Sequence, residues 1–246
     1  MTIRVFDSAA DVARALADRI AVALAEQPAL VLGLATGRTP VEAYAELMAR
    51  CARGEVDFSN AQSFNLDEFV GLAPDHPGSF RRFMDEHFFA GVNLTPSRIH
   101  FLDGTARDLE AECARYERAI AEAGGIDLQL LGIGTNGHVA FNEPGDSLVA
   151  RTHRARLAES TRADNAALFG GNVAAVPVEA LTMGVGTILG AARIVVAATG
   201  AHKAGIVERA VRGPITTGLP ASLLQLHASV ELYLDRPAAS GLRAPA

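Results

Sequence analysis

The hydrophobic positions of this chain alternate between short continuous runs and helical repeats. Continuous apolar runs bounded by turn residues predict buried strands, and apolar residues three or four positions apart predict amphipathic helices. The clearest helix begins after a capping Ser8 and continues to about Glu26. Its apolar face consists of Val12, Leu16, Ile20 and Leu24.

The same reading along the chain predicts an alternation of strands and helices. Strands are expected at residues 3–6, 29–34, 61–66, 98–101, 126–133, 192–198 and 230–235. Further helices are expected at about 40–53, 79–89, 107–123, 201–211 and 220–227, with a loop at 67–78. This order is typical of an α/β fold with a mainly parallel sheet and helices on both faces. We therefore expect one Rossmann-like, three-layer domain over residues 1–236.

Two segments do not follow this pattern. Residues 145–175 are polar and weakly periodic, and we expect them to form a mobile excursion that closes as a lid. Residues 237–246 are expected to be a disordered tail.

The most informative segment is the glycine-rich turn at residues 134–145, which follows the strand expected at 126–133. Ligands of open α/β sheets bind at the carboxyl ends of strands. The turn places Asn136, His138 and Glu143 there, and a histidine can move a proton near neutral pH. A structural alternative is a turn with a capping asparagine and a hydrogen-bonded histidine. The three side chains together favour a functional site over this alternative, because loops at strand ends often carry functional residues.

A second candidate site is the turn between a strand and a helix that contains Thr36, Gly37, Arg38, Thr39 and Pro40. Its backbone N–H groups and the helix dipole could hold a phosphate, and Arg38 could add a guanidinium. A simple helix cap by Thr39 explains the threonine and the proline equally well. The spacing matches neither a Walker A motif nor a dinucleotide-binding motif, so no nucleotide cofactor is indicated.

Two more strand ends carry chemistry. Asp67 and Glu68 end an apolar strand, so one could face a cleft as a general base while the other points away. A solvated turn, with Asp67 as a cap and Glu68 exposed, is the alternative. Lys203 opens the helix after the strand at 192–198, where it could pair with a phosphate or be an ordinary surface lysine.

Composition limits the partners of the protein. The formal net charge is −6 and no run of Lys or Arg occurs, so we expect no nucleic-acid partner. No apolar run approaches the length of a membrane span. The chain starts with a strand pattern and an alanine-rich helix rather than a signal peptide, and Cys51 and Cys113 lack a C-x-x-C spacing. These features favour a cytoplasmic protein with reduced thiols.

Taken together, these segments resemble the glucosamine-6-phosphate deaminase (isomerising) family, which forms a wider group with the 6-phosphogluconolactonases. The resemblance extends from Leu32 to Leu234. It rests on the segments 34–40, 65–72, 137–144, 180–187 and 224–227. The lactonases look similar around Gly137 and His138 but lack the Phe-Asn-Glu-Pro that follows at 141–144.

The resemblance implies that the substrate is an amino-sugar phosphate. It also implies a role for each candidate residue. His138 would assist ring opening, with Glu143 and Asn136 orienting it, and Asp67 would take the proton from C2. The product would be fructose 6-phosphate and ammonia, with no metal or organic cofactor. Glu68 would hold neighbouring residues of the site in place without contacting the substrate. Lys203 and the turn at 36–39 would bind the phosphate.

The chain departs from the resemblance at three places. Many relatives carry Asp at the position of Asn136, and an amide would raise the pKa of His138 less than a carboxylate. Some relatives clamp the phosphate with an Arg where this chain has Ala167, and Arg38, where others have Gly, could substitute for it. The activator site of the hexameric enteric enzymes is not reproduced by His153, Ala155 and Arg156. We expect no such activation, and a monomer or small homo-oligomer.

Two alternatives to a glucosamine-6-phosphate deaminase remain open. The enzyme could prefer galactosamine 6-phosphate or hydrolyse 6-phosphogluconolactone. It could also be a sugar-phosphate-binding regulator without turnover. A regulator has no need of a general base, and one α/β domain accounts for the sequence, so no DNA-binding domain is expected.

Overall fold

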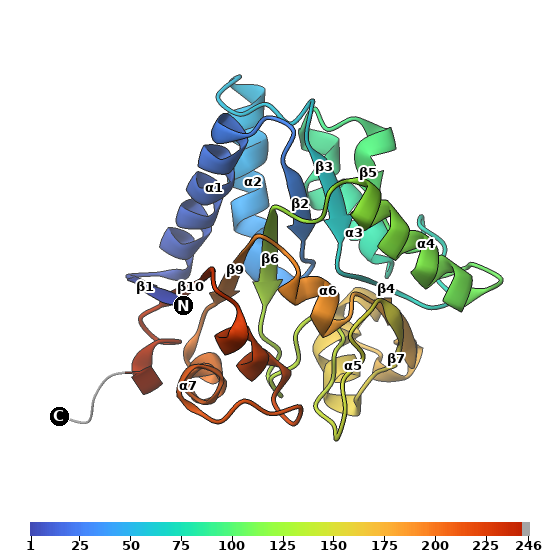
Figure 1. Ribbon diagram of the computed structural model, residues 1–246, viewed down its shortest axis with the longest axis vertical. Helices are drawn as coiled ribbons and strands as arrows, with labels where there is room; N and C mark the ends of the chain where they lie inside the picture. The colour runs from blue at the N-terminus through green and yellow to red at the C-terminus, as the bar shows by residue number, and fades with distance from the viewer. Residues whose placement is uncertain (243–246) are drawn as a thin grey trace.

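A seven-stranded sheet, parallel throughout, forms the centre of the computed structural model, which describes residues 1–242 (Figure 1). Its strands are β1 (Thr2–Phe6), β2 (Val31–Leu34), β3 (Gln62–Asn65), β5 (Ile99–His100), β6 (Leu128–Gly132), β9 (Arg193–Ala198) and β10 (Val230–Asp235). They follow the order β1-β10-β9-β6-β2-β3-β5, and every pairing is parallel. The expected mainly parallel sheet is confirmed. The ends of each strand differ from the predicted ends by at most two residues.

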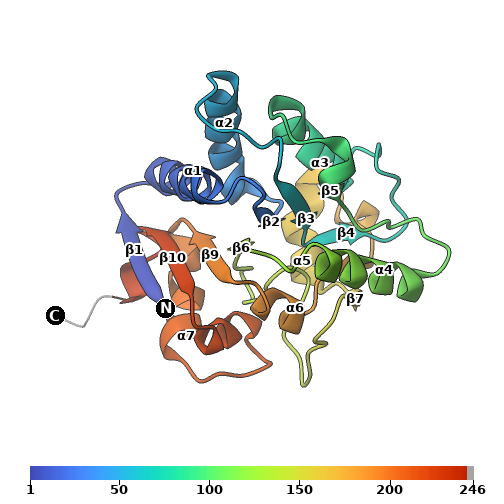
Figure 2. The ribbon, with the colours of Figure 1, turned by 45° about the horizontal axis from the view of Figure 1, so that its top comes forward.

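Helices cover both faces of this sheet, because parallel neighbours need long crossover connections. Figure 2 shows α1 (Ala9–Glu26) and α2 (Arg38–Ala52) on one face and α6 (Val185–Leu189) and α7 (Ala204–Arg212) on the other. The remaining helices are α3 (Phe80–His87), α4 (Leu109–Glu122) and α5 (Glu159–Asn165). The Ser8 side chain accepts a hydrogen bond from the Asp11 N–H, so the predicted start of α1 is correct.

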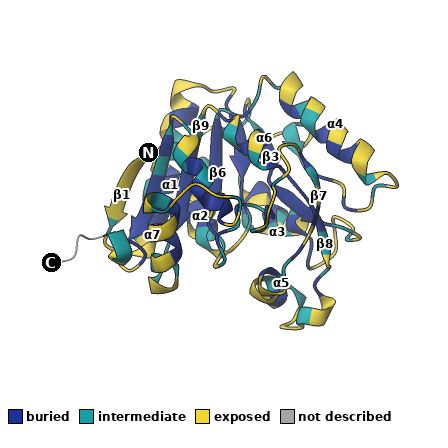
Figure 3. Ribbon diagram, turned by 60° about the horizontal axis from the view of Figure 1, so that its bottom comes forward, coloured by how far each residue is buried: buried dark blue, intermediate teal, exposed yellow. Residues whose placement is uncertain are grey.

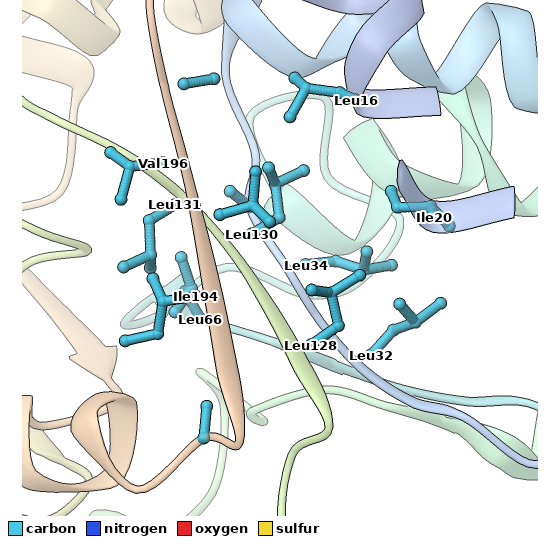
Figure 4. Close-up of a cluster of buried hydrophobic side chains, with 14 of the residues drawn as sticks. Leu16, Ile20, Leu32, Leu34, Leu66, Leu128, Leu130, Leu131, Ile194 and Val196 are labelled. Carbon is cyan, nitrogen blue, oxygen red and sulfur yellow. The ribbon is translucent and has the colours of Figure 1, made fainter. Parts of the chain in front are cut away.

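The main core lies between the sheet and its helices. Leu16 and Ile20 of α1 face leucines of β2 and β6, as the close-up in Figure 4 shows. The central strands are dark blue in Figure 3, because both of their faces are covered. This double coverage explains why these strands are nearly continuous apolar runs in the sequence.

A second, three-stranded sheet was not expected. It pairs β8 (Glu179–Thr182) with both β4 (Asp67–Phe69) and β7 (His153–Arg156), and both pairings are antiparallel. The chain changes sheets at Leu66, whose N–H donates to the Leu34 carbonyl while its own carbonyl accepts from the Met183 N–H. The prediction of a loop over 67–78 was therefore wrong at its start. No helix or strand was predicted over 145–175, but the segment contains β7 and α5.

The end of the chain also differs from expectation. Residues 237–242 were expected to be disordered, but Ala238 and Ala239 are buried and a 3-10 helix forms over Ser240–Leu242. The Ala238 N–H donates to the Asp235 carboxylate, which ties this segment to the end of β10. Residues 243–246 of the expected tail lie outside the described residues. Among residues 1–242, no helix has the length and apolar character needed to cross a membrane.

Candidate active site

A cavity of about 500 Å3 opens at the carboxyl ends of β2, β6 and β9. From β2 the sheet grows through β3 and β5 in one direction, and from β6 it grows through β9 and β10 in the other. Such a switch point leaves a crevice between the diverging connections, and ligands bind there. An apolar void of about 10 Å3 beneath α1 is far too small for a substrate.

The cavity brings together most of the residues that the sequence singled out. Those that line it are Thr36, Gly37, Arg38, Thr39, Asp67, His138 and Lys203. Glu68, Asn136 and Glu143 do not line it; they contact the segments that carry the lining residues.

One end of the cavity is built by the turn between β2 and α2. Gly37 has a φ of +105°, a conformation that strains any residue with a Cβ atom, and it provides no side-chain cap for the helix. α2 begins at Arg38, two residues earlier than expected, so the first-turn N–H groups remain available to an anion. The Tyr44 hydroxyl donates to the Ala35 carbonyl at 2.6 Å and holds the turn in place.

Lys203 reaches the same cavity from the turn after β9. Gly200, with a φ of +89°, allows this turn, and its N–H donates to both carboxylate oxygens of Asp235. The Lys203 ammonium donates to the Ile133 carbonyl at 2.7 Å. Burial lowers the pKa of Lys203, and a nearby Asp164 carboxylate acts in the opposite direction. The alternative of an ordinary surface lysine is therefore wrong.

Asp67 is the buried acid of the cavity. The residue is 6% exposed, and its side chain receives no hydrogen bond from residues 1–242. Burial, and next the neighbouring Glu68, raise the pKa of Asp67 to about 8. A carboxylate with a pKa near the operating pH is suited to accept a proton in catalysis.

Glu68 points away from the cavity and caps α3. Its carboxylate accepts hydrogen bonds from the Ser79 hydroxyl and from the N–H groups of Phe69, Phe80 and Arg81, at 2.8 to 3.1 Å. Burial raises the pKa of Glu68, and these hydrogen bonds oppose that effect. The alternative of a solvated Asp67-Glu68 turn is wrong, because both side chains are buried.

Asn136 and Glu143 form a network behind His138. The Asn136 side chain accepts the His138 N–H at 3.0 Å and donates to Glu143 Oε2 at 2.8 Å. Glu143 Oε1 accepts the Ala158 N–H at 3.2 Å, while its Oε2 lies 3.7 Å from His138 Nδ1. Burial lowers the pKa of His138, and Glu143 counteracts this only in part. The imidazole is therefore neutral at physiological pH.

The backbone of this loop is shaped to hold the imidazole. A Cβ atom on Gly134 would lie 2.3 Å from the His138 ring, so only glycine fits beneath it. Ala140 has a φ of +51°, which is rare for a residue with a side chain. The Asn142 amide donates to the Val139 and Met183 carbonyls and stabilises this strained turn against the segment after β8.

Comparison with known proteins identifies the family of this chain. The family model of glucosamine-6-phosphate isomerases and 6-phosphogluconolactonases matches residues 6–233. The chain belongs to this family. A glucosamine-6-phosphate deaminase of Beutenbergia cavernae is 48% identical over 99% of this chain and 93% of its own length. Glucosamine-6-phosphate deaminase 2 of Bacillus subtilis is 48% identical over 87% of this chain and 86% of its own length.

Solved structures of the family share the fold. One, described as a monomeric glucosamine-6-phosphate deaminase, has a TM-score of 0.94 and 41% identity, and covers 98% of this chain and 100% of its own. A 6-phosphogluconolactonase from Trypanosoma brucei has a TM-score of 0.75 at 22% identity, covering 98% of each chain. At that identity the likeness concerns the fold alone.

Several residues of the site were missed by the sequence analysis, and two of them, Asp164 and Thr161, lie on α5. The Asp164 carboxylate enters the cavity and accepts a hydrogen bond from the Thr135 hydroxyl at 2.9 Å. The buried Thr161 hydroxyl lies 3.3 Å from His138 Nδ1. The two residues are three positions apart and share a helix face, but the weak periodicity of 145–175 concealed the helix that presents them.

Ala167, the position at which the resemblance suggests an arginine in some relatives, is exposed here and does not line the cavity. Arg162, the nearest arginine on α5, donates to the Val173 and Val176 carbonyls and stabilises its own segment instead. Arg38 does line the cavity, as the cation next to the turn at the start of α2. His153, Ala155 and Arg156 lie on β7, away from these residues.

Proposed function

We propose that this protein is a glucosamine-6-phosphate deaminase, which converts glucosamine 6-phosphate and water into fructose 6-phosphate and ammonia. The observation that carries the proposal is the arrangement of one cavity: a buried carboxyl group, a neutral imidazole and an anion-binding turn. The named relatives at 48% identity support the same substrate.

His138 begins the reaction by opening the sugar ring. The neutral imidazole takes the proton of the C1 hydroxyl group and returns a proton to the ring oxygen as the C1–O5 bond breaks. An imidazole is suited to this exchange because its two protonation states are close in free energy near neutral pH. The product of the step is the open-chain aldehyde, in which the proton on C2 is acidic.

Asp67 then transfers a proton between two neighbouring carbons. Its ionised carboxylate removes the C2 proton, which gives an enolamine, and the resulting carboxyl group returns a proton to C1. Water adds to the ketimine at C2, and ammonia leaves to give the ketone. Every step is redox-neutral, so we propose that no cofactor takes part.

We propose that the phosphate lies at the start of α2. The N–H groups of Gly37, Arg38 and Thr39, the Thr36 hydroxyl and the Lys203 ammonium would surround it. Charge-assisted hydrogen bonds to phosphate are strong, and this end of the cavity carries two cations. The sugar would then extend toward Asp67 and His138.

The decisive test measures ammonia release from glucosamine 6-phosphate, coupled to detection of fructose 6-phosphate, for the wild type and Asp67→Asn. Removing the base should lower kcat by roughly 10³-fold, within the range for general acid–base catalysis. The same assay with galactosamine 6-phosphate, and a lactonase assay, test the alternatives. Wild-type activity on one of those substrates alone, or on none of the three, would contradict the proposal.

We also propose that the protein is a monomer in the cytoplasm. A structure of 41% identity is described as that of a monomeric enzyme, and Cys51 and Cys113 are free thiols here, as reducing conditions favour. Sedimentation velocity at protein concentrations from about 1 to about 100 μM, where weak interfaces form, tests the oligomeric state. A single species near the 25.8 kDa of the chain is expected, and a dimer at the lowest concentration would contradict it.

A further inference from the structure

The side chain nearest to the inner nitrogen of His138 comes from α5 and not from the loop that carries the histidine. Thr161 Oγ1 lies 3.3 Å from His138 Nδ1, while the closest oxygen of Glu143 lies at 3.7 Å. Thr161 is 1% exposed, so its hydroxyl is fixed within the protein. Among residues 1–242, Nε2 makes no hydrogen bond and is available to a ligand in the cavity.

Glu143 alone is poorly placed to hold the imidazole. A donor and an acceptor separated by 3.7 Å do not form a normal hydrogen bond. The oxygen concerned already accepts a hydrogen bond from the Asn136 amide at 2.8 Å, and the other oxygen accepts from the Ala158 N–H. The hydroxyl of Thr161 is therefore the direct partner of Nδ1.

The charges around Nδ1 decide which way that hydrogen bond runs. A neutral imidazole carries its proton on one nitrogen and a lone pair on the other. A lone pair on Nδ1 would face the Glu143 carboxylate and be repelled, whereas an N–H would be attracted. With the proton on Nδ1, the Thr161 oxygen accepts it, and the lone pair of Nε2 faces the cavity.

We propose that Thr161 is a positioning residue for His138: its hydroxyl accepts the Nδ1 proton and so makes Nε2 the base that faces the substrate. The tautomer of the histidine then depends on how α5 is seated. Two neighbouring contacts seat the helix, from the Thr135 hydroxyl to Asp164 and from the Ala158 N–H to Glu143. The segment that follows the catalytic turn is thus a component of the proton-transfer apparatus.

Nitrogen-15 NMR of the imidazole rings tests the tautomer directly. The His138 signals are assigned by their loss in His138→Gln, and spectra are recorded at pH 7.5, where the ring is neutral. The wild type should show the Nδ1–H form. In Thr161→Val, which keeps the shape but removes the hydroxyl, the ratio of the Nδ1–H form to the Nε2–H form should fall roughly tenfold, the effect of one lost hydrogen bond.

Two control variants separate positioning from general damage. Thr161→Ser retains the hydroxyl and should restore the wild-type spectrum. Thr152→Val removes another buried threonine hydroxyl, which donates to Glu117 at 2.6 Å, and should leave the His138 spectrum unchanged. An Nε2–H form in the wild type, or the same tautomer ratio in the wild type and Thr161→Val, would overturn the proposal.

The kinetic test rests on the proposed function, whereas the spectroscopic test does not. For ammonia release, Thr161→Val should lower kcat roughly tenfold with KM changed less than about twofold, since the hydroxyl acts on the imidazole and not on substrate binding. Thr161→Ser should recover most of the loss. If the tautomer shifts as expected but the wild type releases no ammonia, the proposed function fails while the positioning role stands. If ammonia is released and neither the tautomer nor kcat depends on the hydroxyl, the positioning role alone fails.

Discussion

At the scale of single residues, adjacent acids in this protein have opposite environments. Asp67 receives no hydrogen bond from the described residues and has a pKa raised to about 8, whereas Glu68 accepts four hydrogen bonds. The difference arises because the chain changes sheets at Leu66, so that Asp67 faces the cavity and Glu68 the start of α3. Burial without hydrogen bonds keeps a carboxyl group weakly acidic, which a base acting near pH 8 requires.

The raised pKa of Asp67 predicts how the rate depends on pH. Below about pH 8 most of the enzyme carries a protonated Asp67, so kcat/KM for ammonia release should rise about tenfold per pH unit and level off above pH 8. His138, whose pKa is lowered, stays neutral over this range and adds no further step. A profile measured from pH 6.5 to 9.5 checks this. A rate that is constant between pH 6.5 and 8 would show that Asp67 is ionised throughout.

Some of these residues could be predicted from the sequence, and others could not. Asp67, His138 and Lys203 follow apolar strands, and strand ends of a parallel sheet meet at one edge, so their assembly was predictable. Thr161 and Asp164 join them only because α5 docks on the catalytic loop. That contact depends on tertiary structure and leaves no local pattern.

At the scale of elements, α3 depends on one buried carboxylate. Glu68 binds the N–H groups of Phe80 and Arg81 and the hydroxyl of the N-cap Ser79. These donors belong to the first turn of a helix of eight residues, Phe80–His87, which has few other backbone partners at that end. The capping links α3 to β4 and so holds Phe80 at the wall of the cavity.

The stability of the protein should therefore depend strongly on Glu68. Glu68→Ala leaves several buried donors without an acceptor and should lower the free energy of unfolding by about 3 kcal/mol. Glu86→Ala is the matched control, because it removes an exposed carboxylate of the same helix and should change stability by less than about 1 kcal/mol. Urea denaturation at pH 7 measures both variants. Equal losses in the two would mean that Glu68 does not cap α3.

Strands with many hydrophobic residues could be predicted from the sequence, and strands with few could not. Central strands of the main sheet, such as β9, are buried on both sides and have nearly continuous apolar sequences. The strands of the second sheet are three or four residues long and include charged side chains, for example Asp67 and Glu68 in β4 and two of the four residues of β7. Sequences that short carry no periodicity, and their pairing is decided by contacts across the fold.

At the scale of the whole molecule, the cavity lies between two structural units that are stabilised by different kinds of contact. The anion-binding turn and Lys203 follow β2 and β9 of the seven-stranded sheet, which are buried strands. α5 belongs to a segment near the small sheet; its one buried residue is Thr161, and Ala158, Thr161 and Asp164 make polar contacts with the catalytic loop. Helices with few buried side chains are typical of segments that open locally.

This difference predicts that ligand binding protects α5 from hydrogen exchange. A phosphorylated open-chain amino alditol, which has no carbonyl group and cannot react, would join the two units by placing its phosphate at α2 and its sugar beside His138. Amides of residues 158–169 should then exchange at least about fivefold more slowly, because opening must break the ligand contacts as well. Amides of α4, which contributes no residue to the lining of the cavity, should not change.

Inorganic phosphate serves as the control ligand, because it can occupy the turn at the start of α2 without reaching His138. It should protect residues 36–40 and leave residues 158–169 unchanged. Unchanged exchange at 158–169 with the amino alditol, under conditions where 36–40 is protected, would mean that the segment is already closed in the free enzyme. In that case the three polar contacts of α5 would be permanent, and substrate would have to enter through an opening that does not involve this helix.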